Sequence, residues 1–548
     1  MKKNSLTTAV VAGIAGAAGL ANVASAVNVN PDGLGQVLIY PYYTVNAGNA
    51  TLISVVNTTD EVKAVKVRFL EALNSREVLD FNLYLSPFDV WTAAVVATDD
   101  TGAGRLVTED TSCTVPAIPA GGVDFRNFAY TGAIDDDGPN GLDRTRTGHI
   151  EMIEMGVVED TNGATFNANT SFADAATHVG GTPLSCATLV NAWRPGGIWD
   201  SGDGTESRTG APDGVTGPVG GLFGGAVIAD VANGTALSYN ADAIDGFYSL
   251  AITSLHTAPG STLPSLSQAQ TSLGEADAIV FDNGRLVTLD FATGRPDAVS
   301  SVFMHDAIYN EFNTDPELNA ASEWVITFPT KRLHIEGTTA AQRLPFTDNA
   351  DDTDPPLSPA GDAIDTLVFD PEGSCEPISI AYFDREEGVP EEAVGDVDFS
   401  PPPPEVIVPG LSLCYEANVV TWNQEDAVTA GESLVLGART EARNINLTAD
   451  LDGNVFTEGW VAMTMGDTDN YLLDLGASGA GDTTGAEDRN QLFGLPVTGF
   501  WAANYVNAAA APGVLANYSQ IHKHRASRSG RSVRVNGSTI TPTGFAAS

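Results

Sequence analysis

The stretch AIDDDGPNGLD, residues 133–143, places carboxylate and amide side chains around two glycines and a proline. Oxygen atoms of this kind are the ligands that calcium prefers, and a site needs about six to eight of them. An EF-hand does not fit, because with Gly138 at position 6 of the loop the ligand positions 1 and 12 would be Ala133 and Arg144. An irregular calcium site remains one interpretation, and a solvated turn is the other, because Asp, Asn, Gly and Pro are common in turns. The oxygens of such a calcium site would come from Asp135, Asp137, Asn140 and Asp143.

The chain has four cysteines and no CxxC spacing, which favours disulfides over a redox centre or a zinc site. Of the alternative pairings, we predict Cys113–Cys186 and Cys375–Cys414, because each pair is closest in sequence and brackets an irregular loop. The first pair would enclose the aspartate loop, and the second would enclose the proline run at residues 401–404.

Other chemistry has little support. The sequence contains no HExxH motif, no Walker loop and no GxGxxG after a strand, and the GASGA segment at residues 476–480 lacks the last glycine of a nucleophile elbow. His149 and Glu151 would share one face of a strand and could both bind a metal, but such a pair is more typical of a solvated surface.

Two further segments have two interpretations each. Trp193 and Trp199 could form a platform on which a sugar stacks, or they could anchor a loop, and the second is the more common role of large rings. Lys331 and Arg332 could bind an anionic ligand, or they could pair with neighbouring acids, and we favour pairing in a chain with so many acids.

The elements that would position these residues are mostly strands. Charged and apolar residues alternate over residues 62–70 and again over 78–85, which is typical of half-buried strands. Residues 278–281 and 286–289 flank an Asn-Gly turn and predict a hairpin. Helix is sparse, and residues 301–312 are its best candidate. The pattern predicts a mainly β fold of two or three antiparallel β-sandwich units, immunoglobulin-like or jelly-roll-like, with long acidic loops and little helix.

Composition divides the chain into six parts. We predict a signal peptide at 1–26, an N-terminal β-sandwich at 27–115, a loop-rich middle β region at 116–346, an acidic Pro-rich loop at 347–360, a C-terminal β-rich domain at 361–520 and a basic tail at 521–548. The tail carries five Lys and Arg residues and no acid. It is either a flexible end or a basic strap that docks on the acidic body of the same or a neighbouring molecule.

The N-terminus predicts export. Lys2 and Lys3 precede an apolar run of small residues that ends in the A-x-A site at residues 24–26, so the mature chain would begin at Val27. No later segment is apolar and long enough to span a membrane as a helix. We therefore expect the mature protein outside the cell, on its surface or in the periplasm. The net charge of −44 argues against binding to nucleic acid.

These observations predict a secreted, acidic, β-rich structural or binding protein of the bacterial cell surface or extracellular matrix. Its expected partners are further copies of itself or other surface components. The alternative is a carbohydrate-active protein, either a glycan-binding module or a glycoside hydrolase, because glycoside hydrolysis needs only two suitably spaced carboxylates and the chain has 70 acids. The missing motifs favour a role without catalysis, and calcium is the one cofactor that the sequence suggests.

Overall fold

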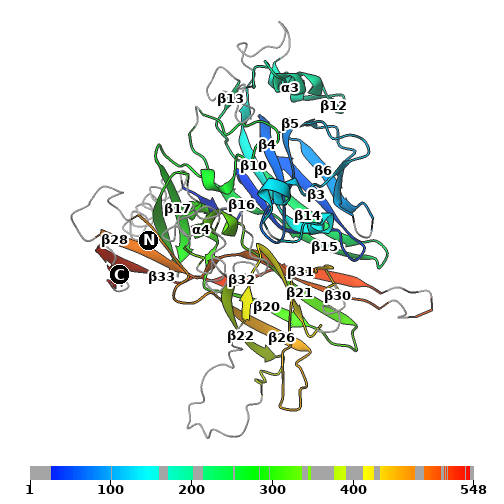
Figure 1. The fold of residues 1–548 in the computed structure, drawn as a ribbon, viewed down its shortest axis with the longest axis vertical. Helices are drawn as coiled ribbons and strands as arrows, with labels where there is room; N and C mark the ends of the chain where they lie inside the picture. The colour runs from blue at the N-terminus through cyan, green and yellow to red at the C-terminus, as the bar shows by residue number, and fades with distance from the viewer. Residues whose placement is uncertain are drawn as a thin grey trace, which may run out of the picture.

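The computed structural model describes residues 26–99, 102–136, 138–159, 171–200, 214–250, 253–282, 284–294, 296–335, 344–346, 375–390, 411–424, 432–475, 487–507, 511–512, 514, 516–536 and 539–543. The segment before residue 26, the Pro-rich loop at 347–360 and Asp137 lie outside these residues. The fold is mainly β, as predicted, and it contains two β-sandwiches of mainly antiparallel strands that lie against each other (Figure 1).

The first sandwich has a sheet of eight strands, in the order β1–β16–β2–β10–β4–β5–β8, with β13 paired to β10. We name it the β4 sheet. Its strands are β1 (Asn28–Val29), β2 (Val37–Thr44), β4 (Val62–Glu71), β5 (Glu77–Leu85), β8 (Cys113–Val115), β10 (Thr147–Val158), β13 (Val215–Thr216) and β16 (Asp242–Asp245).

The second sheet of this sandwich, the β3 sheet, has six strands in the order β15–β14–β3–β6–β7–β9. They are β3 (Asn49–Asn57), β6 (Val90–Ala97), β7 (Gly104–Val107), β9 (Val123–Asp124), β14 (Leu222–Asp230) and β15 (Thr235–Asn240). The period of two in β4 turns Val65, Val67 and Phe69 toward the β3 sheet, where they pack with Trp91 in a continuous apolar core.

The second sandwich has two sheets of five strands. The β26 sheet contains β20 (Ala307–Asn313), β22 (Glu376–Asp384), β23 (Leu411–Leu413), β26 (Glu458–Met465) and β32 (Arg525–Ser527). The β21 sheet contains β21 (Ala320–Thr327), β24 (Ala417–Trp422), β25 (Ala442–Ile445), β30 (Thr498–Tyr505) and β31 (Tyr518–Lys523). Trp324, Trp422 and Met463 fill the core between the two sheets.

A third layer, the covering layer, lies over the outer face of the β4 sheet. It consists of the hairpin β17 (Glu275–Asp282) and β18 (Arg285–Ala292), the helices α2 (Phe172–Ala176), α3 (Cys186–Ala192) and α4 (Asp297–Phe303), and the loop 253–271 with the 3-10 turn η6 (Leu266–Gln268). The hairpin is the predicted one, and Gly284 at its turn has a φ of 84° that glycine adopts without strain.

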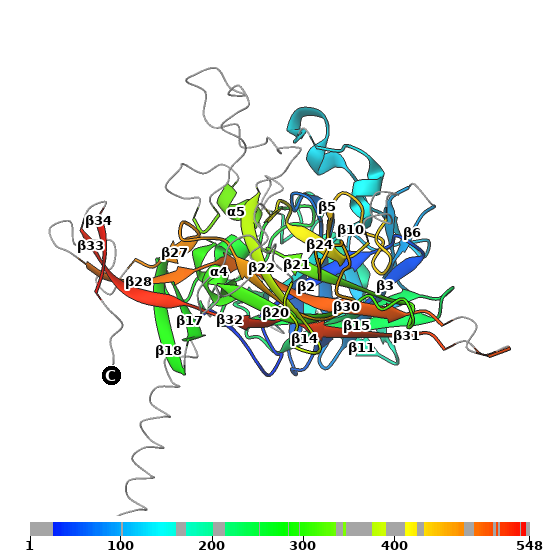
Figure 2. The same cartoon turned by 90° about the horizontal axis from the view of Figure 1, so that it is seen from below.

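A small sheet of β27 (Tyr471–Leu473), β28 (Glu487–Phe493), β33 (Gly530–Asn536) and β34 (Thr539–Pro542) projects at one end of the molecule (Figure 2). The other short elements are β11 (His178–Val179), β12 (Thr182–Pro183), β19 (Met304–His305), β29 (Leu495–Pro496), α5 (Lys331–Ile335), η2 (Phe128–Tyr130), η3 (Gly132–Ile134) and η4 (Leu142–Arg146). None of the helices in the described residues has the length and apolar character needed to cross a membrane.

Strand pairing does not follow the divisions that composition suggested. The first sandwich takes β9, β10 and β13 to β16 from the middle region, and the second takes β20 and β21 from it. The expected helix at 301–312 is also wrong over most of its length. Helix α4 ends at Phe303, and Ile308 and Phe312 belong to β20, where pairing with β26 directs both side chains into the core.

The basic C-terminal segment forms strands on its own molecule. In Figures 1 and 2 it runs along the body from β31 through β32 to β33. Lys523 pairs with Asp242 of the first sandwich, and Arg534 pairs with Asp488 of β28 at 2.8 Å. Described residues of the segment therefore dock on the acidic body of the same molecule, which was one of the two expectations.

Candidate functional site

The aspartate loop is organised by arginine. Asp136 is fully buried, and the guanidinium of Arg144 donates bidentately to it at 2.9 and 2.7 Å and to Glu71 at 2.8 and 2.9 Å. The same guanidinium lies 4.2 Å from the ring centroid of Tyr130. Burial alone would raise the pKa of Asp136, but the hydrogen bonds and charge of Arg144 outweigh this and lower it. One carboxylate of the loop is thus held by a cation of the chain itself.

The proposed calcium ligands are only partly brought together. The Nδ2 of Asn140 donates to Oδ2 of Asp135 at 2.9 Å, and Asp143 is exposed on η4, while Asp137 lies outside the described residues. Within the described chain, no group of three or more His, Cys, Asp or Glu side chains is arranged to hold a metal ion. Calcium binding by this loop stays a prediction.

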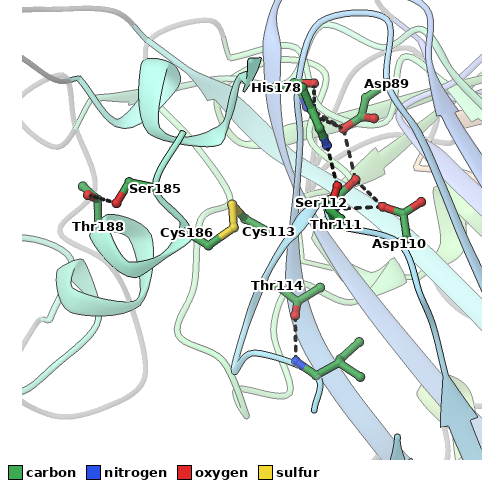
Figure 3. Close-up of a disulfide and its surroundings, with 12 residues drawn as sticks. Asp89, Asp110, Thr111, Ser112, Cys113, Thr114, His178, Ser185, Cys186 and Thr188 are labelled. Carbon is green, nitrogen blue, oxygen red and sulfur yellow. Dashed lines mark hydrogen bonds and ion pairs between the residues drawn. A yellow bond between two sulfur atoms is a disulfide. The ribbon is translucent and has the colours of Figure 1, made fainter. Parts of the chain in front are cut away.

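Both predicted disulfides are present. Cys113 of β8 joins Cys186 at the start of α3 and so ties the covering layer to the edge of the β4 sheet (Figure 3). Cys375 and Cys414 flank the paired residues Glu376 and Leu413 and close the end of the β22–β23 pair. Oxidised cysteines indicate an oxidising, exported environment.

A hydroxyl–imidazole–carboxylate cluster lies beside the first disulfide (Figure 3). His178 Nδ1 lies 3.6 Å from Asp89 Oδ2, and Nε2 lies 3.2 Å from Thr111 Oγ1. In a catalytic triad the carboxylate orients the imidazole through the nitrogen opposite the nucleophile. Here Ser86 Oγ is the closer partner of Nδ1, at 2.8 Å, and none of these residues lines either cavity described below. The cluster links β11, which lies in the chain between α2 and α3 of the covering layer, to the first sandwich.

The two tryptophans considered as a sugar platform pack inward. Trp199 is fully buried, and its ring stacks on Tyr84 with centroids 5.7 Å apart and lies 4.5 Å from Phe172. Trp193 Nε1 donates to the Tyr84 hydroxyl at 2.8 Å. Trp199 therefore anchors a loop of the covering layer and offers no ring face to a sugar.

The charged side chains on the outer face of the β4 sheet are buried. Lys66 pairs with Asp80 at 3.1 Å, and the Lys66 side chain has no exposed surface. The expectation of a half-buried strand at 62–70 is therefore wrong, because every residue of β4 is buried. His149 and Glu151 do share this face, with Nε2 and Oε1 4.0 Å apart, but they lie beneath the covering layer rather than in solvent.

Next to this charged layer lies a cavity of about 870 Å³, which we name the arginine cavity. The β4 sheet forms its floor, the segment 123–134 and the loop 260–266 form its walls, and residues 329–333 of the second sandwich close it. Its charged lining residues are Arg68, Arg76, Glu77, Asp80, Arg126, Glu151 and Arg332.

Two arginines of the cavity are fixed by carboxylates. Arg68 donates to Glu77 at 2.8 Å and to Glu151 at 3.0 Å, and Arg76 lies 3.6 Å from Asp136. Burial raises the pKa of both Glu77 and Glu151, against the opposing effect of Arg68. The floor is a preformed network of ion pairs.

The other two arginines lie at the walls. Arg332 is half-buried, and its Nη1 donates to the Ser75 carbonyl at 2.8 Å. Arg126 is exposed, has no ion pair with a described carboxylate, and lies 5.4 Å from the ring centroid of Phe128. Lys331, by contrast, is buried and donates to the Cys414 carbonyl at 2.8 Å. The charges of Lys331 and Arg332 both oppose the raised pKa of the buried Glu416, which agrees with the predicted interaction with neighbouring acids. Arg332 also lines the cavity, where a ligand could reach it.

A second cavity, of about 710 Å³, lies on the outer face of the β3 sheet. We name this surface the open face. Its lining includes Leu52, Ser54, Thr92 and Val227, and Glu109 is its one charged residue. Leu52 is 46% exposed.

Sequence reasoning missed the arginine cavity. The signal that it offered was the gathering of Lys63, Lys66 and Arg68 in one short strand of a strongly acidic chain. No protein-family model, no curated protein and no solved structure matches this chain.

Proposed function

We propose that this chain is an exported, acidic binding and structural protein of the bacterial cell surface or extracellular matrix. The observation that carries the binding role is the arginine cavity, because a preformed hollow of about 870 Å³ with a few convergent polar groups is the usual form of a small-ligand site. The two disulfides support the exported location.

Export is tested by fractionation and by the mass of the mature chain. Cleavage after Ala26 would leave an α-amino group at Val27, whose nitrogen donates to the Asp277 carbonyl at 2.8 Å and would keep this bond. We expect a mature chain that starts at Val27 and contains no free thiol. An intact chain retained in the cytoplasm with reduced cysteines would contradict the proposal.

Self-assembly is the second half of the proposal, and the open face is the surface that suits it. Two molecules that each carry a net charge of −44 repel each other, so a contact between copies is favoured where charge is scarce. Around its cavity the open face has one acid, Glu109, and it carries Leu52 and Phe223, which are 46% and 43% exposed. Because salt screens the repulsion, association should increase with ionic strength.

Light scattering of the secreted protein tests assembly. The molar mass is measured with and without calcium and at low and high salt. We expect larger species at high salt, and Leu52→Glu and Phe223→Glu should each reduce them. Leu451→Glu is the matched control, because Leu451 is 62% exposed but lies in the turn before β26. A monomer under every condition would overturn the assembly role, and a mass unchanged by calcium would weaken the calcium hypothesis.

A glycan-binding role is the second candidate, and one observation favours it. Trp460 is 41% exposed on the outer face of the β26 sheet, and its ring stacks on Phe383 with centroids 4.7 Å apart. Exposed aromatic rings are common sugar-contact surfaces because they combine an apolar face with rigidity. Binding on a glycan array that Trp460→Ala abolishes and Phe281→Ala preserves would support this role, and silence of the array would count against it.

A further inference from the structure

We propose that the arginine cavity binds an organic anion, in which a carboxylate, sulfate or phosphate group is joined to an apolar portion. The inference rests on the binding half of the proposed function and names its ligand class. The first observation behind this inference is the unusual charge of the residues that line the arginine cavity. Four arginines and three acids line it, in a chain whose net charge is −44. Because the field of the whole molecule repels anions, an anion that binds has to be recognised by local contacts.

The carboxylates of the cavity already accept hydrogen bonds from groups of the protein. Asp80 Oδ2 accepts from Lys66 Nζ at 3.1 Å and from the Gly260 N–H at 2.8 Å. Glu77 and Glu151 both accept from Arg68. The acids therefore hold the floor and the wall together, and they are not arranged to receive a cation.

Two guanidinium groups face this floor from different elements. Arg126 comes from the segment after β9 of the first sandwich, and Arg332 comes from α5 beyond β21 of the second. Arg126 forms no ion pair with a described carboxylate, although its charge helps to lower the pKa of Asp124. Arg332 donates to a backbone carbonyl through one nitrogen, and its charge opposes the raised pKa of Glu151. The planar fork of a guanidinium suits bidentate bonds to carboxylate, sulfate and phosphate groups alike.

The remaining walls are apolar. Phe128 is 66% exposed and Ile134 is 41% exposed, and both line the cavity together with Leu263, Leu266 and Leu333. Burying such side chains against an apolar ligand is favourable, whereas an inorganic anion would leave them in water. A neutral apolar ligand would in turn leave the arginines without a new partner. Only a ligand with both portions uses the whole site.

Calorimetric titration of the full-length protein with chain-matched probes tests this inference. Octanoate, octyl sulfate and octyl phosphate carry the three anionic groups, octanol lacks a charge, and inorganic sulfate lacks the chain. We expect at least one octyl anion to bind about tenfold or more tightly than both octanol and sulfate, and the order among the three identifies the preferred group. Octanol that binds as tightly as every octyl anion would overturn the proposal.

Variants locate the site. Arg126→Gln should weaken octyl-anion binding about tenfold, and Arg126→Lys should weaken it less, because the charge remains without the fork. Arg534→Gln is the matched control, since Arg534 is an exposed arginine on β33, and it should bind as the parent protein does. Thr262→Trp adds bulk at an exposed lining residue without changing charge and should abolish binding.

Arg332→Gln should act like Arg126→Gln, and circular dichroism establishes whether it folds despite the lost bond to Ser75. If it does not fold, Arg126→Gln and Thr262→Trp carry the test. Binding that both of these variants leave at the parent level would overturn the proposal. Failure of the anion-binding proposal would not change the expected export or the salt dependence of the molar mass. The two proposals can therefore fail independently of each other.

Discussion

The two outer faces of the first sandwich differ in a way that polarity alone does not explain. On the β4 sheet the outer face carries Lys66 and Arg68, and both are buried. On the β3 sheet the outer face has the exposed Arg105–Asp124 pair at its edge. The surface around the cavity, however, has one charged residue, Glu109, and is open to solvent around Leu52 and Phe223. Exposure is therefore decided by which face the rest of the chain covers.

The buried charges help to fix where the covering layer lies. Lys66 Nζ donates to the Ala258 carbonyl at 3.0 Å, and Asp80 accepts from the Gly260 N–H, so the loop of the covering layer is bonded to the sheet. Burying ions is costly, and the cost is offset only where partners and hydrogen bonds are complete. We interpret these ion pairs as determinants of position more than of stability.

Breaking a buried pair is expected to give the largest effect. Lys66→Met would leave Asp80, whose side chain is 11% exposed, with the Gly260 N–H but without its lysine partner. The expected loss in the free energy of unfolding is about 3–5 kcal/mol, measured by urea denaturation. Thr92→Met introduces the same side chain on the open face, where no ion pair is broken, and should cost less than about 0.5 kcal/mol. Equal losses in the two variants would contradict the comparison.

The charged face should also make the protein sensitive to acid. Burial lowers the pKa of His149 to about 3, and the charge of Arg68 acts in the same direction. Because the unfolded chain binds this proton near pH 6.5, His149 contributes stability above that pH and loses it as the pH falls toward 3. The free energy of unfolding should fall by up to about 1.4 kcal/mol per pH unit for this one group.

His149→Phe should make this pH dependence shallower, because it removes a buried imidazole that has no hydrogen-bond partner among the described residues. His256 has its pKa lowered to about 3, chiefly by burial, and would supply a residual slope. Urea midpoints between pH 4 and pH 7 test this, with Thr92→Met expected to keep the parent slope. An unchanged slope in His149→Phe would show that this imidazole is not a source of the acid sensitivity.

Local signals were sufficient for some parts of the fold. The alternation in residues 62–70 correctly predicted the strand β4. Both disulfides were correctly predicted by pairing the cysteines that are closest in sequence in a chain expected to be exported. The alternation also suggested that one face of β4 meets solvent. That inference failed because residues such as Ala258 and Trp199, which cover the face, come from segments distant in sequence. The alternation of residue types along a strand does not show whether another segment of the chain covers its polar face.

The arginine cavity could not be predicted for a related reason. Arg68, Arg126 and Arg332 come from a strand, a loop and a short helix of two sandwiches, and only the docking of those sandwiches brings them together. Tertiary pairing likewise overrode the helical pattern at residues 301–312, because β20 lies between β26 and β32. Sequence patterns predict local structure and short loops, whereas the arginine cavity is formed by contacts between residues far apart in the sequence.

The smallest expected change in stability is also the most informative. Leu52→Glu places a charge on the open face, where the parent side chain is 46% exposed, so the free energy of unfolding should change by no more than about 0.5 kcal/mol. The same variant should strongly reduce the association that salt promotes, because it adds repulsion at the surface where two copies would meet. Lys66→Met should do the reverse, lowering the urea midpoint while the folded fraction keeps its salt-dependent mass. If Leu52→Glu instead destabilised the monomer as much as Lys66→Met, the open face would belong to the folding core, and the contrast between a covered face that is sensitive to substitution and an open face that mediates association would fail.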